Sequence, residues 1–319
     1  MLIPQTIADE GARFLMERGY EIVKGSGISE DELAEAIQAC DAVLARTERY
    51  TENVIRAGRK VRVIARHGVG VDNINVPLAT ELGIYVTTTP MANAVSVAEH
   101  ALTLILALSK KLMAIDRAFR KGNWEIRNQV FGMELEGKTL GILGLGRIGS
   151  MLAKKAYHGL GMNVIGYDPY VPADRLPEGV RQADWNAIFE QSDFVSVHLP
   201  AAPETMGIIG RKELELMKPS AYFVNAARGE VVNERDLVAV LNENRIAGAG
   251  LDVFREEPLP ASHPFFQMEQ VLMTPHNAAL TEESRAKMAL HAAMSIDEVL
   301  TGKSPSWPVN HPVPKGVNH

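Results

Sequence analysis

Hydrophobic and polar positions alternate along the chain in two rhythms from Ile7 onward. Amphipathic runs of helical period are separated by short apolar runs rich in β-branched residues. That order is typical of a parallel sheet whose strands are joined by crossover helices, so the pattern predicts an α/β fold. In the first hundred residues we predict a helix at 30–39 and strands at 21–23, 42–45, 63–65 and 84–86.

A long amphipathic stretch at 97–121 follows. Ser96 is a suitable N-cap, Glu99 lies at the capping-box position, and Gly122 follows the last helical residue. We therefore predict a single helix that bridges two domains.

A second series of apolar strands comes after that helix, with a spacing that predicts a doubly wound sheet. The six strands are expected at 139–143, 163–167, 194–199, 221–225, 248–252 and 271–273. The C-terminal part is predicted to form a helix at 282–300 and a proline-rich tail with Trp307, Pro308, Pro312 and Pro314.

Composition narrows the class of protein. At roughly 150 residues per domain, 319 residues predict about two domains. The single cysteine, Cys40, has no partner for an intrachain disulfide, and no Cys/His cluster has metal-ligand spacing, so we expect a cytoplasmic protein without a metal. A net charge of −6 argues against nucleic acid as a partner. The most apolar stretch, 101–108, is far shorter than the ~20 residues of a membrane-spanning helix, so we expect no membrane partner.

A glycine-rich turn joins a predicted strand to the helix predicted at 150–158. It has the spacing G-x-G-x-x-G, with Gly144, Gly146 and Gly149. In such a turn the first glycine permits the bend, the second leaves room for a pyrophosphate, and the third lets helix and strand pack closely. The helix N-terminus then faces the anion, and Arg147 is available for a charged contact.

A carboxylate about 20 residues beyond this turn favours a dinucleotide over an ordinary glycine-rich turn. Asp168 follows strand 163–167, where it can accept hydrogen bonds from an adenosine ribose. A carboxylate there repels a 2′-phosphate, and no arginine follows Asp168 until Arg175, so NAD is favoured over NADP.

Three residues at or after later strand ends are candidates for proton transfer and anion binding. They are Arg228, Glu257 and His276. Each alone is equally consistent with an ordinary surface residue. Together they suit hydride chemistry, because a histidine can exchange the hydroxyl proton, a carboxylate can raise the pKa of a histidine, and a guanidinium can bind a carboxylate with two hydrogen bonds.

The order and spacing of these motifs resemble the D-isomer-specific 2-hydroxyacid dehydrogenase family, which includes D-3-phosphoglycerate dehydrogenases. The resemblance covers nearly the whole chain. It lies in residues 140–149, Asp168, 225–230, 251–257 and 274–276, and in 67–74, which resembles the family's substrate-carboxylate loop.

The resemblance implies two doubly wound domains, of Rossmann and flavodoxin-like type, with a cleft between them. The substrate-binding domain would comprise 1–97 and 290–319, and the NAD-binding Rossmann domain 98–289. Members are usually homodimers. The long helix and the loop around Trp124 correspond to the dimerisation region, although an apolar helix face is equally consistent with a core contact.

By the same resemblance, Arg228 binds the carboxylate and carbonyl oxygen of the substrate. His276 is the general acid and base, held and charged by Glu257. Hydride passes between C2 of the substrate and C4 of the nicotinamide. The negative charge that develops on oxygen is stabilised by the arginine and the protonated imidazole more in the transition state than in the ground state.

The resemblance also implies further dinucleotide contacts beside the glycines and Asp168. They are Arg147, Ile148, His198, Leu199, Pro200, Thr205, Ala226, Ala227 and Asp252. A purely backbone role at a strand end remains an alternative for His198. We expect the other histidines to be structural or solvated: His100, His158, His263, His291, His311 and His319.

The implied substrate-binding residues are Arg46, His67, Val69, Gly70 and Arg228. Arg46 resembles the phosphate-contacting arginine of phosphoglycerate dehydrogenases. His67 stands where many members have a small residue, and with the two arginines at 46 and 66 it would make the mouth of the pocket cationic. These arginines are equally consistent with ordinary surface charges.

Two further features depart from the family pattern, beside His67. His276 is followed by Asn277-Ala278-Ala279, where many members carry Ile-Gly-Ala, so we expect the methyl group of Ala278 and the amide of Asn277 at the nicotinamide edge. The chain ends at His319, before the regulatory domain of longer phosphoglycerate dehydrogenases, so serine feedback is not expected.

The sequence therefore favours an NAD-dependent oxidoreductase of D-2-hydroxy acids, with 3-phosphoglycerate as the leading substrate and hydroxypyruvate or glyoxylate as the alternative. A protein of another class, an NAD-sensing corepressor, has the same fold but needs a peptide groove that nothing in the sequence indicates. Formate oxidation is disfavoured, because that branch has a Gln where this chain has Glu257.

Overall fold

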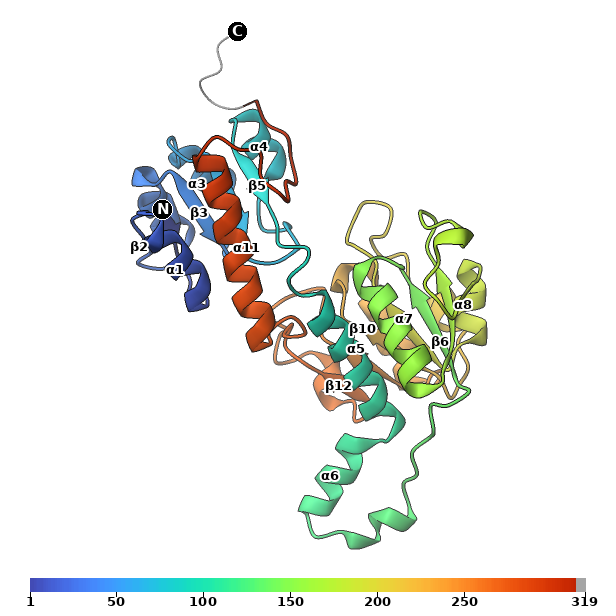
Figure 1. The fold of residues 1–319 in the computed structure, drawn as a ribbon. Coiled ribbons are helices and arrows are strands. Elements are labelled where there is room, and N and C mark those ends of the chain that lie inside the picture. Colours follow the sequence, from blue (N-terminus) through green and yellow to red (C-terminus); the bar gives the residue numbers. More distant parts are fainter. Residues whose placement is uncertain (314–319) are drawn as a thin grey trace. The chain divides into compact units, whose positions relative to one another are not determined.

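The computed structural model describes residues 1–313 (Figure 1). The chain divides into two compact units. Unit 1 contains Met1–Asn93 and the chain from Leu280 onward, and unit 2 is Ala94–Ala279. Both are α/β units with wholly parallel sheets, so the predicted fold class is confirmed.

Unit 1 is built on five strands in the order β2-β1-β3-β4-β5, the flavodoxin-like order. The strands are β1 (Leu2–Ile3), β2 (Val23–Lys24), β3 (Ala42–Ala45), β4 (Val63–Arg66) and β5 (Tyr85–Thr87). The helices are α1 (Asp9–Glu17), α2 (Glu30–Ala36), α3 (Glu52–Ala57), α4 (Val76–Glu81) and α11 (Glu282–Leu300). The predicted strand at 21–23 is therefore displaced to β2, and the predicted helix at 30–39 ends in a 3-10 turn, η1 (Ile37–Ala39).

Helices cover both faces of this sheet. Ala42 and Leu44 of β3 pack with α1 and α11, whereas Val43 and Ala45 pack with α2, α3 and α4. This alternation with both faces buried explains the short, continuously apolar strands of the sequence. Gly11 allows α1 to approach α11, because a Cβ there would lie 2.6 Å from the carbonyl oxygen of Ala289.

The proline-rich tail runs beside β5 of unit 1. The N–H of Val309 donates to the carbonyl of Val86, and the buried Asn310 side chain accepts from the N–H of Val86 and donates to Ile84. Pro314 and His319 lie outside the described residues.

Unit 2 contains seven strands in the order β12-β11-β10-β9-β6-β7-β8, a Rossmann order with the reversal between β6 and β9. They are β6 (Thr139–Leu143), β7 (Asn163–Tyr167), β8 (Val180–Gln182), β9 (Phe194–Val197), β10 (Tyr222–Asn225), β11 (Gly248–Leu251) and β12 (Val271–Met273). The prediction of six strands missed β8, a short edge strand in which Arg181 and Gln182 are exposed.

Two apolar layers sandwich this sheet. One contains α5 (Ala94–Ser109) and α7 (Arg147–Leu160), and the other contains α8 (Trp185–Gln191), α9 (Arg211–Leu214) and α10 (Glu234–Asn242). The remaining elements are α6 (Leu112–Arg120) and four short 3-10 helices, η2 (Trp124–Asn128), η3 (Ala173–Arg175), η4 (Gly229–Val231) and η5 (Pro264–Gln267).

The prediction of one long helix at 97–121 is wrong. The chain forms α5 and α6 instead, broken where Lys111 adopts a left-handed conformation with φ of 50°. The N–H of Met133, on the returning segment, donates to the carbonyl of Ser109 and so satisfies the end of α5. Ser96 is not the N-cap, because α5 begins at Ala94 and Ser96 is buried inside it.

Candidate active site

The sequence-predicted residues of unit 2 lie in loops after the carboxyl ends of its strands. Because the strands are parallel, these loops lie at one edge of the sheet. The glycine-rich turn follows β6, Asp168 follows β7, His198 follows β9, Arg228 follows β10, Glu257 follows β11 and His276 follows β12.

The three glycines of the turn differ in what requires them. Gly144 has φ of 92°, and a Cβ on it would lie 2.8 Å from the carbonyl oxygen of His198. A Cβ on Gly149 would lie 2.0 Å from the carbonyl oxygen of Gly144. A Cβ on Gly146, which caps the N-terminus of α7, would meet nothing within 4 Å. Packing therefore requires two of the glycines, and the third faces open space where a phosphate group fits.

Asp168 links this turn to the loop after β7. One carboxylate oxygen accepts from the N–H of Leu145 at 2.9 Å, and the other accepts from the N–H of Tyr170 at 2.9 Å. The carboxylate is thus fixed beside the glycine-rich turn, and each of its oxygens keeps a second lone pair for a ribose hydroxyl.

His198 is held in the sheet by its backbone N–H, which donates to Leu143, and its Nε2 lies 2.9 Å from the hydroxyl of Ser196. Burial lowers the pKa of His198 to about 4, so this imidazole is neutral at pH 7. The Thr205 hydroxyl closes the turn that follows, donating to the carbonyl of Pro200 and accepting from the N–H of Ala202.

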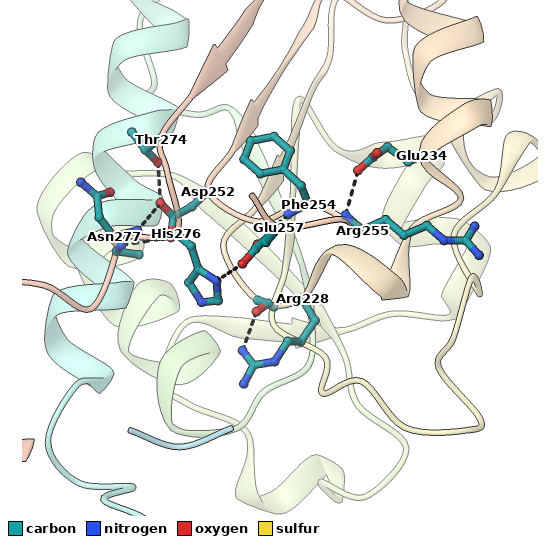
Figure 2. A network of polar contacts seen from close by, with 11 residues as sticks. Arg228, Glu234, Asp252, Phe254, Arg255, Glu257, Thr274, His276 and Asn277 are labelled. Carbon is teal, nitrogen blue, oxygen red and sulfur yellow. Dashed lines mark hydrogen bonds and ion pairs between the residues drawn. The ribbon is translucent and has the colours of Figure 1, made fainter. Parts of the chain in front are cut away.

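Glu257 and His276 form a direct pair (Figure 2). Oε2 of Glu257 lies 2.6 Å from Nδ1 of His276, and Oε1 accepts from the N–H of Phe254 at 3.0 Å. Burial alone would raise the pKa of the Glu257 carboxyl, but these hydrogen bonds and the charges of His276 and Arg228 outweigh it and lower the pKa. The carboxylate is therefore ionised at neutral pH and faces the imidazole.

The turn that carries Arg228 is held by the side chain of Asn225 and packs against the loop of Glu257. The side chain of Asn225 accepts from the N–H of Ala227 at 3.0 Å and donates to the carbonyl of Arg228 at 2.9 Å. Gly229 lets this turn pack on the loop of Glu257, because a Cβ there would lie 2.0 Å from the carbonyl carbon of Phe254.

Asp252 organises the backbone around His276. The carboxylate, 1% exposed, accepts from the hydroxyl of Thr274 at 2.6 Å and from the N–H groups of Asn277 and Ala278 at 2.9 and 3.0 Å. The backbone carbonyl of Asp252 accepts from the N–H of His276, which has φ of 49°. This carboxylate thus supports the turn that presents the imidazole.

Two further residues lie near Asp252. His100, expected to be structural or solvated, has Nε2 2.9 Å from the Thr274 hydroxyl and 3.6 Å from the Asp252 carboxylate, so it has a structural role in this network. Ala278 is 4% exposed within the apolar cluster of unit 2. The methyl group therefore packs into the core, which corrects the expectation that it lines the nicotinamide edge, whereas Asn277 is exposed.

The expected substrate residues of unit 1 lie in the loops after β3 and β4. His67 precedes a loop in which Gly68 has φ of 139° and is hydrogen-bonded to Thr89, while Val69 is 42% exposed. The guanidinium of Arg46, in the loop after β3, donates to the carbonyl of Thr6 at 2.7 Å.

His67 contributes no positive charge to this region at neutral pH. Its side chain is buried, and burial together with the charges of Arg46 and Arg66 lowers its pKa to about 4. The expectation that His67 itself makes the pocket mouth cationic is therefore wrong. Any positive charge there comes from the arginines.

Three of the remaining histidines have partners or surroundings outside the Glu257–His276 pair. His158 is exposed and pairs with Glu178 at 3.5 Å, His291 stacks on Trp307, and His311 is exposed. His319 is outside the described residues. Within residues 1–313, no group of three or more His, Cys, Asp or Glu side chains is arranged to hold a metal ion, and no helix has the length and apolarity to cross a membrane.

Comparisons with known proteins agree with this geometry. Residues 102–278 match the model of the D-isomer specific 2-hydroxyacid dehydrogenase, NAD binding domain. D-3-phosphoglycerate dehydrogenase of Methanocaldococcus jannaschii is 40% identical over 98% of this chain and 59% of its own length, and glyoxylate reductase of Korarchaeum cryptofilum is 38% identical over 89% of this chain and 86% of its own. The TT0316 protein of Thermus thermophilus superposes with a TM-score of 0.89 at 32% identity, over 97% of this chain and 99% of its own.

Fold and site define a dinucleotide-binding protein of the doubly wound class, in which unit 2 provides the nucleotide domain. The chain belongs to the D-isomer specific 2-hydroxyacid dehydrogenase family, and NAD is its cofactor. It spans 59% of the length of the phosphoglycerate dehydrogenases from Methanocaldococcus jannaschii and Archaeoglobus fulgidus.

Proposed function

We propose that this protein is an NAD-dependent oxidoreductase that interconverts D-2-hydroxy acids and 2-keto acids. The observation that carries the proposal is the 2.6 Å contact between Glu257 and His276, at the same sheet edge as the glycine-rich turn and Arg228. A paired imidazole beside a nucleotide turn provides a proton donor next to a hydride donor.

In this proposal the residues have separate tasks. His276 gives a proton to the carbonyl oxygen in reduction and accepts it in oxidation, and the ionised Glu257 favours the protonated imidazole. Arg228 binds the substrate carboxylate and the developing oxyanion. NADH, when bound, supplies the hydride.

The cofactor contacts are proposed from the sequence together with the position of each residue. The backbone of the glycine-rich turn at Gly144, Gly146 and Gly149 would hold the pyrophosphate, with Arg147 and Ile148 at the start of α7. Asp168 would bind the ribose and favour NAD over NADP. The residues proposed to line the rest of the dinucleotide are His198, Leu199, Pro200, Thr205, Ala226 and Ala227. Asp252, whose carboxylate is buried, would act there through the turn that it holds.

For the substrate we propose 3-phosphoglycerate and its keto acid, with Arg46 as a phosphate contact and with His67, Val69 and Gly70 as further contacts. The similarity to phosphoglycerate dehydrogenases supports this choice. Hydroxypyruvate or glyoxylate is the second candidate, favoured by the glyoxylate reductase relative, of which this chain covers 86%.

A panel of 2-keto acids tests the proposal. NADH oxidation would be measured with phosphohydroxypyruvate, hydroxypyruvate, glyoxylate, pyruvate and an aromatic keto acid, and the best substrate repeated with NADPH. We expect the highest kcat/KM with phosphohydroxypyruvate and NADH. Turnover of none of them, with NADH still bound, would overturn the enzymatic proposal.

We further propose a cytoplasmic homodimer. Helix α6 has no buried residue, and large apolar side chains are exposed on it and on the segment that follows, namely Leu112, Met113, Phe119, Trp124 and Phe131. Such a surface suits a second copy of the chain. Sedimentation would give twice the 34.9 kDa chain mass, and cell fractionation would test the compartment.

A further inference from the structure

We infer that Glu234 and His263 are positioning residues that clamp the loop 255–263 and thereby hold Glu257 against His276. The inference deepens the proposed function and rests on it, because it concerns the pair proposed to transfer the proton. Glu234 contacts Arg255 and His263, and the residue that contacts His276 is Glu257.

The near end of the loop is held by two carboxylates. The N–H of Arg255 donates to Oε2 of Glu234 at 3.0 Å, and the preceding N–H, of Phe254, donates to Oε1 of Glu257 at 3.0 Å. Figure 2 shows Glu234 on the Arg255 side of this turn and Glu257 on the side of the imidazole. Glu234 thus fixes the N–H of Arg255, which directly follows the N–H of Phe254 that orients Glu257.

The far end of the loop returns to the same carboxylate. Nε2 of His263 lies 3.1 Å from Oε1 of Glu234, and Nδ1 of His263 accepts from the N–H of Phe265 at 3.3 Å. Because Nδ1 is an acceptor, the ring proton is on Nε2, which donates to Glu234. The side chains of Glu234 and His263 are 15% and 18% exposed, so this contact is largely shielded from water.

The loop needs such a clamp because its packing contacts lie at its flanks and at Leu259, which packs against the core of unit 2. Phe254 and Phe265 are buried in the core of unit 2, whereas residues 255–258 are exposed. An exposed segment without packing contacts opens easily. The charged groups around Glu257 are His276 and Arg228, and Glu234 faces His263, so the clamp acts on Glu257 through the backbone.

The test compares Glu234→Ala with Glu257→Gln in the full chain. In 2-keto acid reduction the alkaline limb of kcat/KM reports loss of the donor proton, and removing the carboxylate partner moves that limb to lower pH. We expect Glu234→Ala to move it in the same direction by less and to lower kcat about tenfold, with an unchanged NADH dissociation constant. The double variant should behave like Glu257→Gln alone.

Two matched variants separate positioning from general effects. Glu256→Ala removes an exposed negative charge from the same loop and should leave the limb in place. His263→Gln keeps an N–H donor for Glu234 and should recover most of what His263→Ala loses. A Glu234→Ala protein with lowered kcat but an unmoved limb, or with effects that add to those of Glu257→Gln, would overturn the inference.

An NMR titration of the His276 imidazole distinguishes failure of the inference from failure of the proposed function. The signal is identified by its absence in His276→Gln. A titration midpoint lowered in Glu234→Ala supports the clamp even if no keto acid is turned over. An unmoved midpoint in an active, folded enzyme contradicts the clamp and leaves the proposed function standing.

Discussion

The candidate proton-transfer region of unit 2 and the candidate substrate loop of unit 1 are held in different ways. Around His276, carboxylates accept hydrogen bonds from backbone N–H groups and so fix two turns: Asp252 holds the turn at 277–278, and Glu257 and Glu234 hold the turn at 254–255. In unit 1, Val69 is exposed, and His67 is buried in its neutral form. Unit 1 has one such bond as well, because the N–H of Arg46 donates to the carboxylate of Glu48 at 2.9 Å, but in the loop after His67 the N–H of Gly68 donates to the hydroxyl of Thr89 instead of a carboxylate.

We infer from this difference that unit 2 determines the chemistry and that unit 1 determines the selectivity for the substrate. Turns held by carboxylate-to-backbone hydrogen bonds place the proposed acid and base with little dependence on the substrate. The residues at 46, 67 and 69 of unit 1 can change without disturbing those turns. We therefore expect variants in unit 2 to act on kcat and variants in unit 1 to act on KM and on substrate preference.

The largest effect is expected from His276→Gln. Loss of the proton donor should lower kcat about 10³-fold, because general acid catalysis contributes about 10²- to 10⁴-fold. NADH binding, followed by fluorescence, should persist. The exposed His158 provides the control, and His158→Gln should retain full turnover. A kcat within a few-fold of the unaltered enzyme would remove His276 from the mechanism.

Arg46→Ala tests whether unit 1 determines the substrate preference. A hydrogen bond to a charged group is worth about 1.5–3 kcal/mol, so KM for phosphohydroxypyruvate should rise about 10- to 100-fold while KM for hydroxypyruvate changes little. Arg56→Ala, which removes an exposed arginine paired with Glu52, is the matched control. Equal increases for both substrates would show that Arg46 does not contact a phosphate.

Asp168→Ala should weaken NAD binding about tenfold and relax the discrimination against NADP, because the carboxylate proposed to bind the ribose is removed. The same change frees the N–H groups of Leu145 and Tyr170, so thermal stability must be measured beside the two cofactor affinities. An unchanged ratio of NAD to NADP affinity would assign cofactor choice to another residue.

The smallest effect concerns the stability of His67→Leu as a function of pH. The pKa of His67 is lowered to about 4 in the folded chain, so the unfolded chain binds a proton more readily as the pH falls below about 6.5, and the folded state loses stability. Removing this histidine should reduce the loss between pH 7.5 and pH 5 by about 2 kcal/mol. Urea unfolding at the two pH values measures it, and an identical loss in both proteins would show that folding does not lower the pKa of His67.

The sequence predicted the elements whose signals are local. The strand before Gly144, the helix at 282–300 and five further strands of unit 2 follow from apolar runs and capping residues. Gly144 and Gly149 were recognisable because close backbone approach at these points leaves no room for a side chain.

What the sequence did not predict depends on contacts between distant segments. The end of α5 depends on the N–H of Met133, far along the chain from Ser109, and no pattern around Lys111 reports that contact. His100 reaches Thr274 only through the fold, and nothing in the sequence around either residue indicates the other. The roles of Glu234 and His263 were missed in the same way, because a carboxylate that binds a backbone N–H leaves no mark on the hydrophobic pattern.

The stereochemistry of the product tests the central claim most directly. The unaltered enzyme and His276→Gln would be incubated with NADH and the best 2-keto acid of the panel, and the 2-hydroxy acid formed would be separated by chiral chromatography. The account predicts the D isomer alone from the unaltered enzyme and almost none from the variant. An L or racemic product, or equal yields from both proteins, would contradict the proposed reaction and the assignment of His276 as the proton donor.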